Sequence, residues 1–259
     1  MISGIFHQGS GLGNQLFRYV ATRVKAMDLG VGWMMKYQAD GSGKTEGFKG
    51  RGLFLNNAEA VAWSQGENWP DKQWHEKKVV ENGVDIRGYD PEFNFIEDGT
   101  TIEGEFQDER YWKHRESEVR EWLKTEPLEV PDDLCIINFR GGEFKVFPDL
   151  FLPKEYWDEG IQRMKAINPD MRFEVHTDDP ETAKQFFPDY KIIQDIGLNW
   201  RSVRYAKYAI IANSSFPILP RWLRHGEGEA ITIAPRGWAR HNIKVWALPS
   251  NYYDRFLYI

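Results

Sequence analysis

A short glycine-rich segment near the N-terminus has the composition of an anion-binding loop. The apolar run Ile2–Phe6 is followed by Gly-Ser-Gly-Leu-Gly-Asn-Gln at residues 9–15, and then by apolar residues at helical spacing. Glycines let a ligand approach the backbone, and the first turn of a helix presents N–H groups with partial positive charge. The segment lacks the lysine of a P-loop and the last glycine of a dinucleotide fingerprint. It favours a phosphate contact, and a tight turn that only lets strand and helix pack is the alternative.

A basic residue follows the first apolar run of the C-terminal half. Arg140 comes directly after Leu134–Phe139 and precedes Gly141-Gly142-Glu143. A guanidinium at this position can hold a diphosphate through two parallel hydrogen bonds, and it never loses its charge. A surface arginine paired with Glu143 is an equally good interpretation.

Acidic residues follow the next apolar run, Arg172–His176. Pro180 at the first position of a helix identifies Asp179 as the helix cap. Asp178 is then left to accept hydrogen bonds from a base edge or a ribose hydroxyl. His176 is predicted to be a core or wall histidine with satisfied hydrogen bonds rather than a catalyst.

A third polar cluster follows the run Ala209–Ala212 and consists of Asn213, Ser214, Ser215 and Phe216. The two hydroxyls and the first N–H groups of the helix expected next form a second phosphate cradle, although helix capping alone also selects serine. No Asp-x-Asp occurs, and no two of the six histidines are four residues apart. We therefore expect no metal and no other cofactor.

The elements that must position these residues alternate along the C-terminal half. Such alternation predicts a parallel sheet with helices on its faces, and ligands bind beyond the carboxyl ends of such strands. Before it, residues 38–52 are glycine-rich and predicted to be a flexible excursion, and a strand from Thr101 is predicted to lead into a helix that continues to Lys124. The other predicted elements are the strands Leu134–Phe139, Arg172–His176, Ala209–Ala212 and Ala230–Ile233 and the helices Lys154–Ile167, Glu181–Phe187, Trp200–Lys207 and Leu219–Leu223.

The composition is that of a globular protein, and residues 126–132, with two prolines, predict a linker between domains 1–126 and 127–259. The formal net charge of -6 argues against a nucleic-acid partner. The single cysteine, Cys135, rules out an internal disulfide and is predicted to be a buried hydrophobe, which favours a reducing compartment. No run approaches the roughly 20 apolar residues of a membrane span. We expect a cytoplasmic protein.

Taken together, four segments resemble the alpha-1,2-fucosyltransferases of glycosyltransferase family eleven and, more loosely, other GDP-fucose-dependent fucosyltransferases. Residues 9–17 are similar to the family's opening Gly-Gly-Leu-Gly-Asn-Gln-Met/Leu-Phe, and residues 103–112 to its Gly-Tyr-Phe-Gln-Ser-Glu-Lys-Tyr-Phe segment. Thr-Asp-Asp at 177–179 corresponds to Ser/Thr-Asp-Asp, and residues 211–216 match Ile-Ala-Asn-Ser-Ser-Phe.

The main departure from the family lies at residues 138–143. Where the family has His-x-Arg-Arg-Gly-Asp, this chain has Asn138, Arg140, Gly141 and Glu143 in place of the His, the first Arg, the second Arg and the Asp. After Ser-Ser-Phe, the family's Ser-Trp-Trp is Pro-Ile-Leu at 217–219. These departures leave the donor sugar and the acceptor linkage open.

The resemblance implies an α/β fold of the GT-B type, with two Rossmann-like domains facing across a cleft. Residues 1–126 would form the acceptor side with the glycine loop, and 127–259 would bind the nucleotide sugar, with the last residues packing back on the N-terminal domain. The implied reaction is metal-independent transfer of fucose, with inversion, from GDP-fucose to a glycan hydroxyl. The substrate-binding residues would be Gly11, Gly13, Asn14, Gln15, Asn138, Asp178, Asn213, Ser214, Ser215 and Phe216.

The implied catalytic residues are Arg140, for the charge of the departing diphosphate, and Glu143, as general base. Glu105 and His7 are the other candidates for the base. Two alternative functions stay open: a GT-B enzyme that uses another nucleotide sugar, and a GDP-binding inactive descendant.

Overall fold

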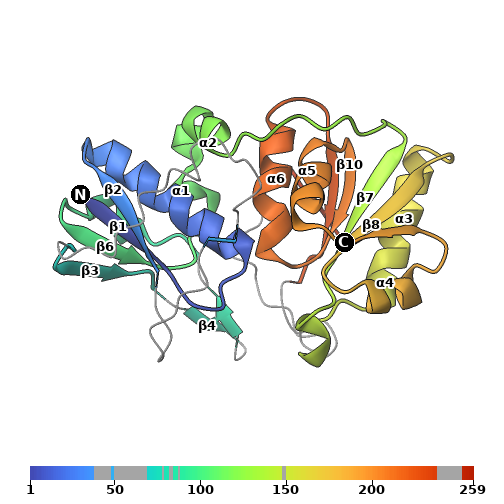
Figure 1. Ribbon diagram of the computed structural model, residues 1–259, viewed down its shortest axis with the longest axis horizontal. Coiled ribbons are helices and arrows are strands. Elements are labelled where there is room, and N and C mark those ends of the chain that lie inside the picture. Colours follow the sequence, from blue (N-terminus) through green and yellow to red (C-terminus); the bar gives the residue numbers. More distant parts are fainter. Residues whose placement is uncertain are drawn as a thin grey trace. The chain divides into compact units, whose positions relative to one another are not determined.

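The chain divides into two compact units, which the computed structural model describes over residues 1–37, 48–49, 69–77, 79–81, 84–86, 88–147, 150–237 and 253–259 (Figure 1). Unit 1 comprises Met1–Val80 and Asp85–Thr125, and unit 2 comprises Glu81–Val84 and Glu126–Ile259. The main boundary follows Thr125, whereas the predicted one follows residue 126. The predicted excursion at 38–52 lies outside the described residues except for 48 and 49.

Unit 1 is built on a four-stranded sheet with the order β2-β1-β6-β3, in which all neighbouring strands are parallel. The predicted first strand and helix are confirmed, and Gly4 lets them approach closely, because a Cβ there would lie 2.2 Å from Oγ1 of Thr22. The elements are β1 (Ile2–Phe6), α1 (Leu12–Leu29), β2 (Trp33–Tyr37), β3 (Lys72–His75), η1 (Pro91–Phe95) and β6 (Thr100–Glu103), and β4 (Val79–Glu81) and β5 (Val84–Ile86) form a separate two-stranded sheet.

The prediction of one continuous helix after β6 was wrong. The segment forms three short pieces, η2 (Glu109–Tyr111), η3 (Lys113–Arg115) and α2 (Glu116–Trp122). Trp112 separates the first two with a non-helical backbone (φ −144°, ψ −9°). Its indole is fully buried and donates its N–H to the carbonyl of Phe106 over 3.1 Å. Burial of the large ring therefore interrupts the helix.

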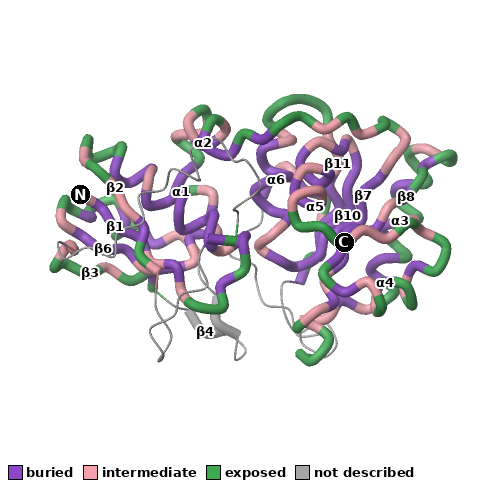
Figure 2. Tube along the Cα trace, viewed as in Figure 1, coloured by how far each residue is buried: buried purple, intermediate pink, exposed green. Residues whose placement is uncertain are grey.

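Unit 2 is built on a six-stranded sheet with the order β12-β11-β10-β7-β8-β9, again parallel between all neighbours. Figure 2 shows the central strands β7 and β10 as almost entirely buried. The elements are β7 (Leu134–Phe139), η4 (Phe144–Val146), α3 (Lys154–Ile167), β8 (Arg172–Thr177), α4 (Pro180–Phe186), β9 (Lys191–Ile193), α5 (Ile196–Tyr205), β10 (Tyr208–Ile211), α6 (Ser215–His225), β11 (Ile231–Ala234) and β12 (Leu257–Tyr258).

The alternation predicted for this half is confirmed, with β7 and α3 beginning and ending at the predicted residues. Helices α5 and α6 begin earlier than predicted, at Ile196 and Ser215. The edge strands β9 and β12 were not predicted. Whereas the last residues were expected to pack on the N-terminal domain, residues 253–259 contribute β12 to the sheet of unit 2.

The strand order of unit 2 reverses between β7 and β10. From β7 the chain adds β8 and β9 on one side, and it then returns to add β10 and β11 on the other. The pairing continues beyond the strand ends, because the N–H of Ala212 donates to the carbonyl of Asn138 over 3.0 Å. Reversal points of this kind are where open α/β sheets bind ligands, at the carboxyl ends of the strands.

A fully buried arginine ties helices α5 and α6 to this sheet. Arg221 on α6 donates from Nη1 to the carbonyls of Val203 (3.0 Å) and Ala206 (2.7 Å) at the end of α5, and from Nε to Oγ1 of Thr232 (2.7 Å). Burial lowers the pKa of Arg221 to about 9. Cys135 on β7 is fully buried, as predicted, and burial raises the pKa of its thiol.

Candidate functional site

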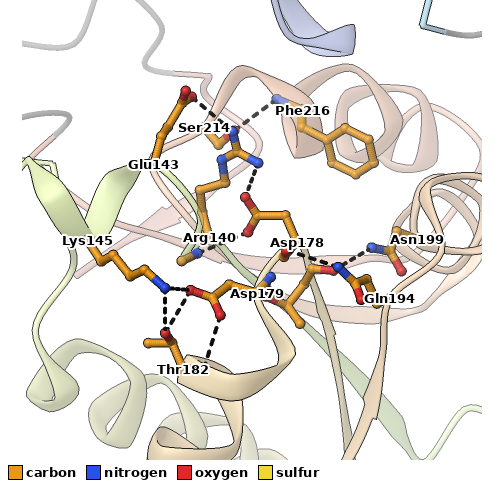
Figure 3. A network of polar contacts seen from close by, with 12 residues as sticks. Arg140, Glu143, Lys145, Asp178, Asp179, Thr182, Gln194, Asn199, Ser214 and Phe216 are labelled. Atoms are coloured by element: carbon orange, nitrogen blue, oxygen red, sulfur yellow. Dashed lines mark hydrogen bonds and ion pairs between the residues drawn. The ribbon is translucent and has the colours of Figure 1, made fainter.

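The carboxyl edge of the unit 2 sheet gathers three of the predicted site residues. Arg140 follows β7, Asp178 follows β8 and Ser214 follows β10 (Figure 3). Because β10, β7 and β8 are adjacent and parallel, these strands end side by side. The topology therefore brings together residues that lie far apart in the sequence.

Arg140 is held by two carboxylates. Its Nη1 donates to Oδ2 of Asp178, and its Nη2 donates to Oε1 of Glu143 over 3.0 Å. The side chain is 30% exposed and its guanidinium carbon lies 5.3 Å from the ring centre of Phe144. Within the described residues, Nε of Arg140 is buried and has no hydrogen-bond partner. The pairing with Glu143 expected from the sequence is observed, and it leaves other N–H groups of the guanidinium for an anion.

Asp178 fixes the loop that carries Arg140. Besides the guanidinium, its carboxylate accepts the N–H of Gly141 over 3.1 Å. At Gly142, with φ +20°, a Cβ would lie 2.2 Å from Oδ2 of Asp178, and at Gly141 it would lie 2.7 Å from Cβ of Asp179. Because these two residues are glycines, the loop can pack directly against the two aspartates.

Asp179 caps α4, as predicted. Its Oδ1 accepts the N–H of Thr182 over 3.2 Å, and its Oδ2 accepts Nζ of Lys145 over 2.6 Å. Burial raises the pKa of Asp179, but the hydrogen bonds from Lys145 and Thr182 outweigh it and leave this pKa below its usual value. The hydrogen bond to Asp179 raises the pKa of Lys145. Lys145 was not singled out in the sequence, and it gives the loop a second attachment.

The start of α6 provides the N–H groups expected from the sequence. Ser214 is the N-cap, and its Oγ accepts the N–H of Phe216 over 3.4 Å. Asn213 is buried and donates from Nδ2 to the carbonyl of Leu150 over 2.9 Å, and the ring of Phe216 packs edge-on against Trp200. Asn213 and Phe216 are therefore fixed by contacts within unit 2, whereas Ser215 is partly exposed.

Two further residues of unit 2 are buried at this edge. Asn138 lies near the end of β7 and is 6% exposed. His176 on β8 is fully buried, with Nδ1 2.8 Å from Oδ1 of Asn199 and Nε2 2.8 Å from Oε1 of Glu174. Burial lowers the pKa of His176 despite these hydrogen bonds. The prediction of a satisfied core histidine is confirmed.

The glycine loop of unit 1 leads into α1, as predicted. Gly11 is the N-cap with φ −65° and no side-chain cap, and a Cβ there would meet no atom within 4 Å. Gly13 is buried in the first turn. Oδ1 of Asn14 accepts Nε2 of Gln107 over 3.1 Å, and Oε1 of the buried Gln15 accepts the N–H of Lys49 over 2.9 Å. The amide groups of both residues thus have partners within unit 1.

The structure also contains an open cavity of about 660 Å³ in unit 2, away from these residues. Because its walls come from the segment before β7 and from the ends of α5 and α6, it lies at the amino edge of the sheet. It is therefore not part of the site at the carboxyl edge. Its lining residues are Leu128, Glu129, Val130, Pro131, Asp132, Tyr205, Arg224 and Glu227.

Neither a metal-binding cluster nor a membrane-spanning helix occurs in the described ranges. No group of three or more His, Cys, Asp or Glu side chains there is arranged to hold a metal ion. None of the helices in those ranges has the length and apolar character needed to cross a membrane.

No protein-family model and no curated protein sequence matches this chain. Among solved structures, it is similar to E. coli heptosyltransferase WaaC with ADP, at 12% identity and a TM-score of 0.53 over 100% of this chain and 92% of that one. Two others match at 12% identity: the iron-containing dodecameric glycosyltransferase TibC from enterotoxigenic E. coli H10407 (TM-score 0.47, 99% of this chain and 61% of that one) and NodZ alpha-1,6-fucosyltransferase soaked with GDP-fucose (TM-score 0.42, 85% and 92%).

The likeness to WaaC shows the fold. The predicted α/β class of the GT-B type, with two units that each contain a parallel sheet, is confirmed. The resemblance to the fucosyltransferases of family eleven stays a prediction.

Proposed function

We propose that this protein is a metal-independent, inverting glycosyltransferase that transfers fucose from GDP-fucose to a hydroxyl group of a glycan. The observation that carries the proposal is the position of Arg140 and of the start of α6, which flank the point where the strand order of unit 2 reverses. A permanent cation and a helix N-terminus at that point form a site for a nucleotide diphosphate. The resemblance in the four segments of sequence supports fucose and GDP.

In this reaction negative charge grows on the departing diphosphate while the sugar carbon becomes oxocarbenium-like. Donors that already face the developing charge lower the barrier. Arg140 and the N–H groups that follow Ser214 fill this role, with Asn138 and Ser215 beside them as further donor contacts. A guanidinium has five N–H groups; Arg140 donates one to Asp178 and one to Glu143 and keeps others for the diphosphate.

The carboxylate of Asp178 can accept further hydrogen bonds, in this proposal from the nucleoside. A carboxylate offers about four lone-pair sites, of which Arg140 and Gly141 occupy two. The side chain is 29% exposed. We assign it two tasks, holding Arg140 and accepting a hydrogen bond from the guanine or ribose. In unit 1, Gly11, Gly13, Asn14 and Gln15 shape the loop assigned to substrate binding.

The test measures GDP release from GDP-fucose over a panel of glycans, for wild type and Arg140→Ala. We expect the variant to release GDP about 100-fold more slowly or worse, the usual cost of one such donor. Arg163→Ala is the matched control, because Arg163 forms a surface ion pair with Glu159 on α3 of the same unit. Equal rates for Arg140→Ala and wild type would remove Arg140 from the mechanism.

Nucleotide competition separates the alternatives. GDP should protect the enzyme from thermal unfolding more strongly than UDP or ADP at equal concentration. A preference for UDP or ADP would favour a GT-B enzyme with another nucleotide sugar. Tight GDP binding without transfer to any acceptor would favour an inactive descendant.

A further inference from the structure

The loop that carries Arg140 also exposes apolar side chains. Phe147 is 53% exposed, Val146 is 66% exposed, and Phe144, at the start of η4, is partly exposed. Single apolar residues on a surface need no explanation, but these three gather on one short segment. All of them follow β7 in unit 2, directly after the residue to which we assign the diphosphate.

The ring of Phe144 lies beside the guanidinium of Arg140. The guanidinium carbon is 5.3 Å from the ring centre, a distance at which a cation and an aromatic face attract each other. This contact places an aromatic ring at the phosphate end of the candidate site. Phe144 is therefore engaged by the protein itself and helps to position Arg140.

The geometry of η4 places Phe147 one turn beyond Phe144. The N–H of Phe147 donates to the carbonyl of Phe144 over 2.9 Å, which is the hydrogen bond of a 3₁₀ turn. Residues three apart in such a turn lie on the same side, about 6 Å from each other along its axis. In a nucleoside diphosphate the ribose separates the base from the phosphates. A ring one turn beyond the phosphate end therefore suits the base.

The backbone that presents Phe147 is fixed on both sides. The N–H of Lys145 donates to the carbonyl of Gly141 over 3.0 Å, and Nζ of the same lysine donates to Asp179 over 2.6 Å. After the turn, the N–H of Phe151 donates to the carbonyl of Phe147 over 3.2 Å. A ligand that packs on this ring has little of the protein left to order, which favours binding.

An exposed aromatic ring beside a nucleotide site can stack on a base. Every base has a flat π face, so stacking adds affinity without selecting one base over another. Val146 has no flat face, and Phe144 is engaged by Arg140. Of the three apolar side chains, Phe147 is the one suited to a base.

We propose that Phe147 is the stacking platform for the base of the nucleotide donor; this rests on the proposed function. The diphosphate lies at Arg140 and the start of α6, and the ring of Phe147 packs against the face of the base. Asp178 keeps the tasks assigned to it above. Phe147 thus raises the affinity for any nucleotide, whereas the choice of base is made by hydrogen bonds.

The test measures the Kd for GDP and the Kd for inorganic pyrophosphate by calorimetric titration. In Phe147→Ala we expect the Kd for GDP to rise about 10-fold or more, the usual effect of removing a ring that stacks on a base, with the Kd for pyrophosphate unchanged. Arg140→Ala should weaken the binding of both. Phe95→Ala is the matched control, because Phe95 is an exposed phenylalanine on η1 of unit 1.

Two further measurements distinguish stacking from a general apolar contact. Phe147→Trp should bind GDP at least as tightly as wild type, whereas Phe147→Leu, which is apolar but lacks a flat ring, should recover only part of the affinity. The factor lost in Phe147→Ala should be similar for ADP and GDP, because stacking does not select the base. An unchanged melting temperature without nucleotide shows that each variant is folded. Wild-type affinity in Phe147→Leu would contradict stacking.

The outcomes separate the two proposals. If wild type binds neither GDP nor pyrophosphate, the proposed function fails and this inference fails with it. If wild type binds GDP and Phe147→Ala binds it equally tightly, the assignment of Phe147 is wrong and the proposed function stands. If Phe147→Ala weakens pyrophosphate binding as much as GDP binding, Phe147 acts through the loop of Arg140 and is not a stacking residue.

Discussion

The carboxyl edges of the two sheets differ in the kind of polar group that they present. The edge of unit 2 has a guanidinium, Arg140, and the start of α6, both of which are positive at any physiological pH. The edge of unit 1 has imidazoles, those of His75 and His7, around Glu103. Permanent positive charge suits an anion, and titratable imidazoles suit the transfer of a proton. Parallel sheets thus gather polar side chains at the carboxyl edge in both units, and the two sets differ in the kind of charge that they carry.

Unit 2 also contains a histidine, His225, that we expect to stay neutral in the folded protein. Its protonation in acid should give the largest loss of stability among these predictions. Burial, together with Arg221, Arg255 and Arg224, lowers the pKa of His225 in unit 2 to about 4. Between the unfolded pKa near 6.5 and this value only the unfolded chain binds the proton, so stability falls as the pH falls. The loss reaches at most about 3 kcal/mol below pH 4.

Denaturant unfolding at pH 7, 6, 5 and 4 measures this slope, with His225→Gln as the variant that flattens it. A wild-type free energy of unfolding that is constant from pH 7 to pH 4 would contradict a half-buried, neutral His225.

Asp178→Asn tests whether the edge of unit 2 acts through fixed charge. We expect the Kd for GDP to rise about 10- to 100-fold, because the amide loses the charge-assisted bond to Arg140. Calorimetric titration gives the Kd, and Asp158→Asn, which alters a surface ion pair on α3, is the control. An unchanged Kd for GDP in Asp178→Asn would show that the edge of unit 2 does not depend on this charge.

Gly142→Ala tests the packing of the same loop. A Cβ at Gly142 would lie 2.2 Å from Oδ2 of Asp178, so the loop or the carboxylate must move. We expect GDP affinity to fall about 10-fold, which corresponds to about 1.4 kcal/mol. Gly32→Ala is the control, because a Cβ there meets no atom within 4 Å. Unchanged affinity in Gly142→Ala would show that Arg140 does not depend on this contact.

The smallest effect is expected for Lys145→Ala. Its Nζ pairs with Asp179, but the lysine side chain is 47% exposed, so the pair contributes little to stability. Thermal unfolding with and without GDP measures it. A loss of GDP affinity in Lys145→Ala as large as that in Asp178→Asn would mean that the Lys145–Asp179 pair holds the loop as firmly as the Arg140–Asp178 pair.

The central elements of unit 2 were predictable because the pattern of apolar residues within each segment is enough to identify it. The run Leu134–Phe139 is apolar and buried, and α3 has apolar residues at helical spacing, so both have the predicted bounds. The edge strand β9 has three residues, none of them buried, and gives no such signal. The interruption at Trp112 depends on a buried partner, the carbonyl of Phe106, which periodicity does not reveal.

The residues of the candidate site could be named one by one from the sequence, but the contacts between them could not. Arg140 and Asp178 were each named from their place after a strand. Their pairing depends on β7 and β8 being neighbours, which the tertiary structure decides. His75 gave no signal, because it faces Glu103 only through the pairing of β3 with β6, strands 24 residues or more apart in the sequence.

The pairing of Arg140 with Asp178 has a consequence for ionic strength. An exposed arginine attracts solution anions, and a ligand that displaces them binds more weakly as salt is added. Here the protein itself supplies a counterion, Asp178, so nucleotide binding releases few ions from Arg140 to the solvent. Nucleotide affinity should therefore respond only weakly to added potassium chloride.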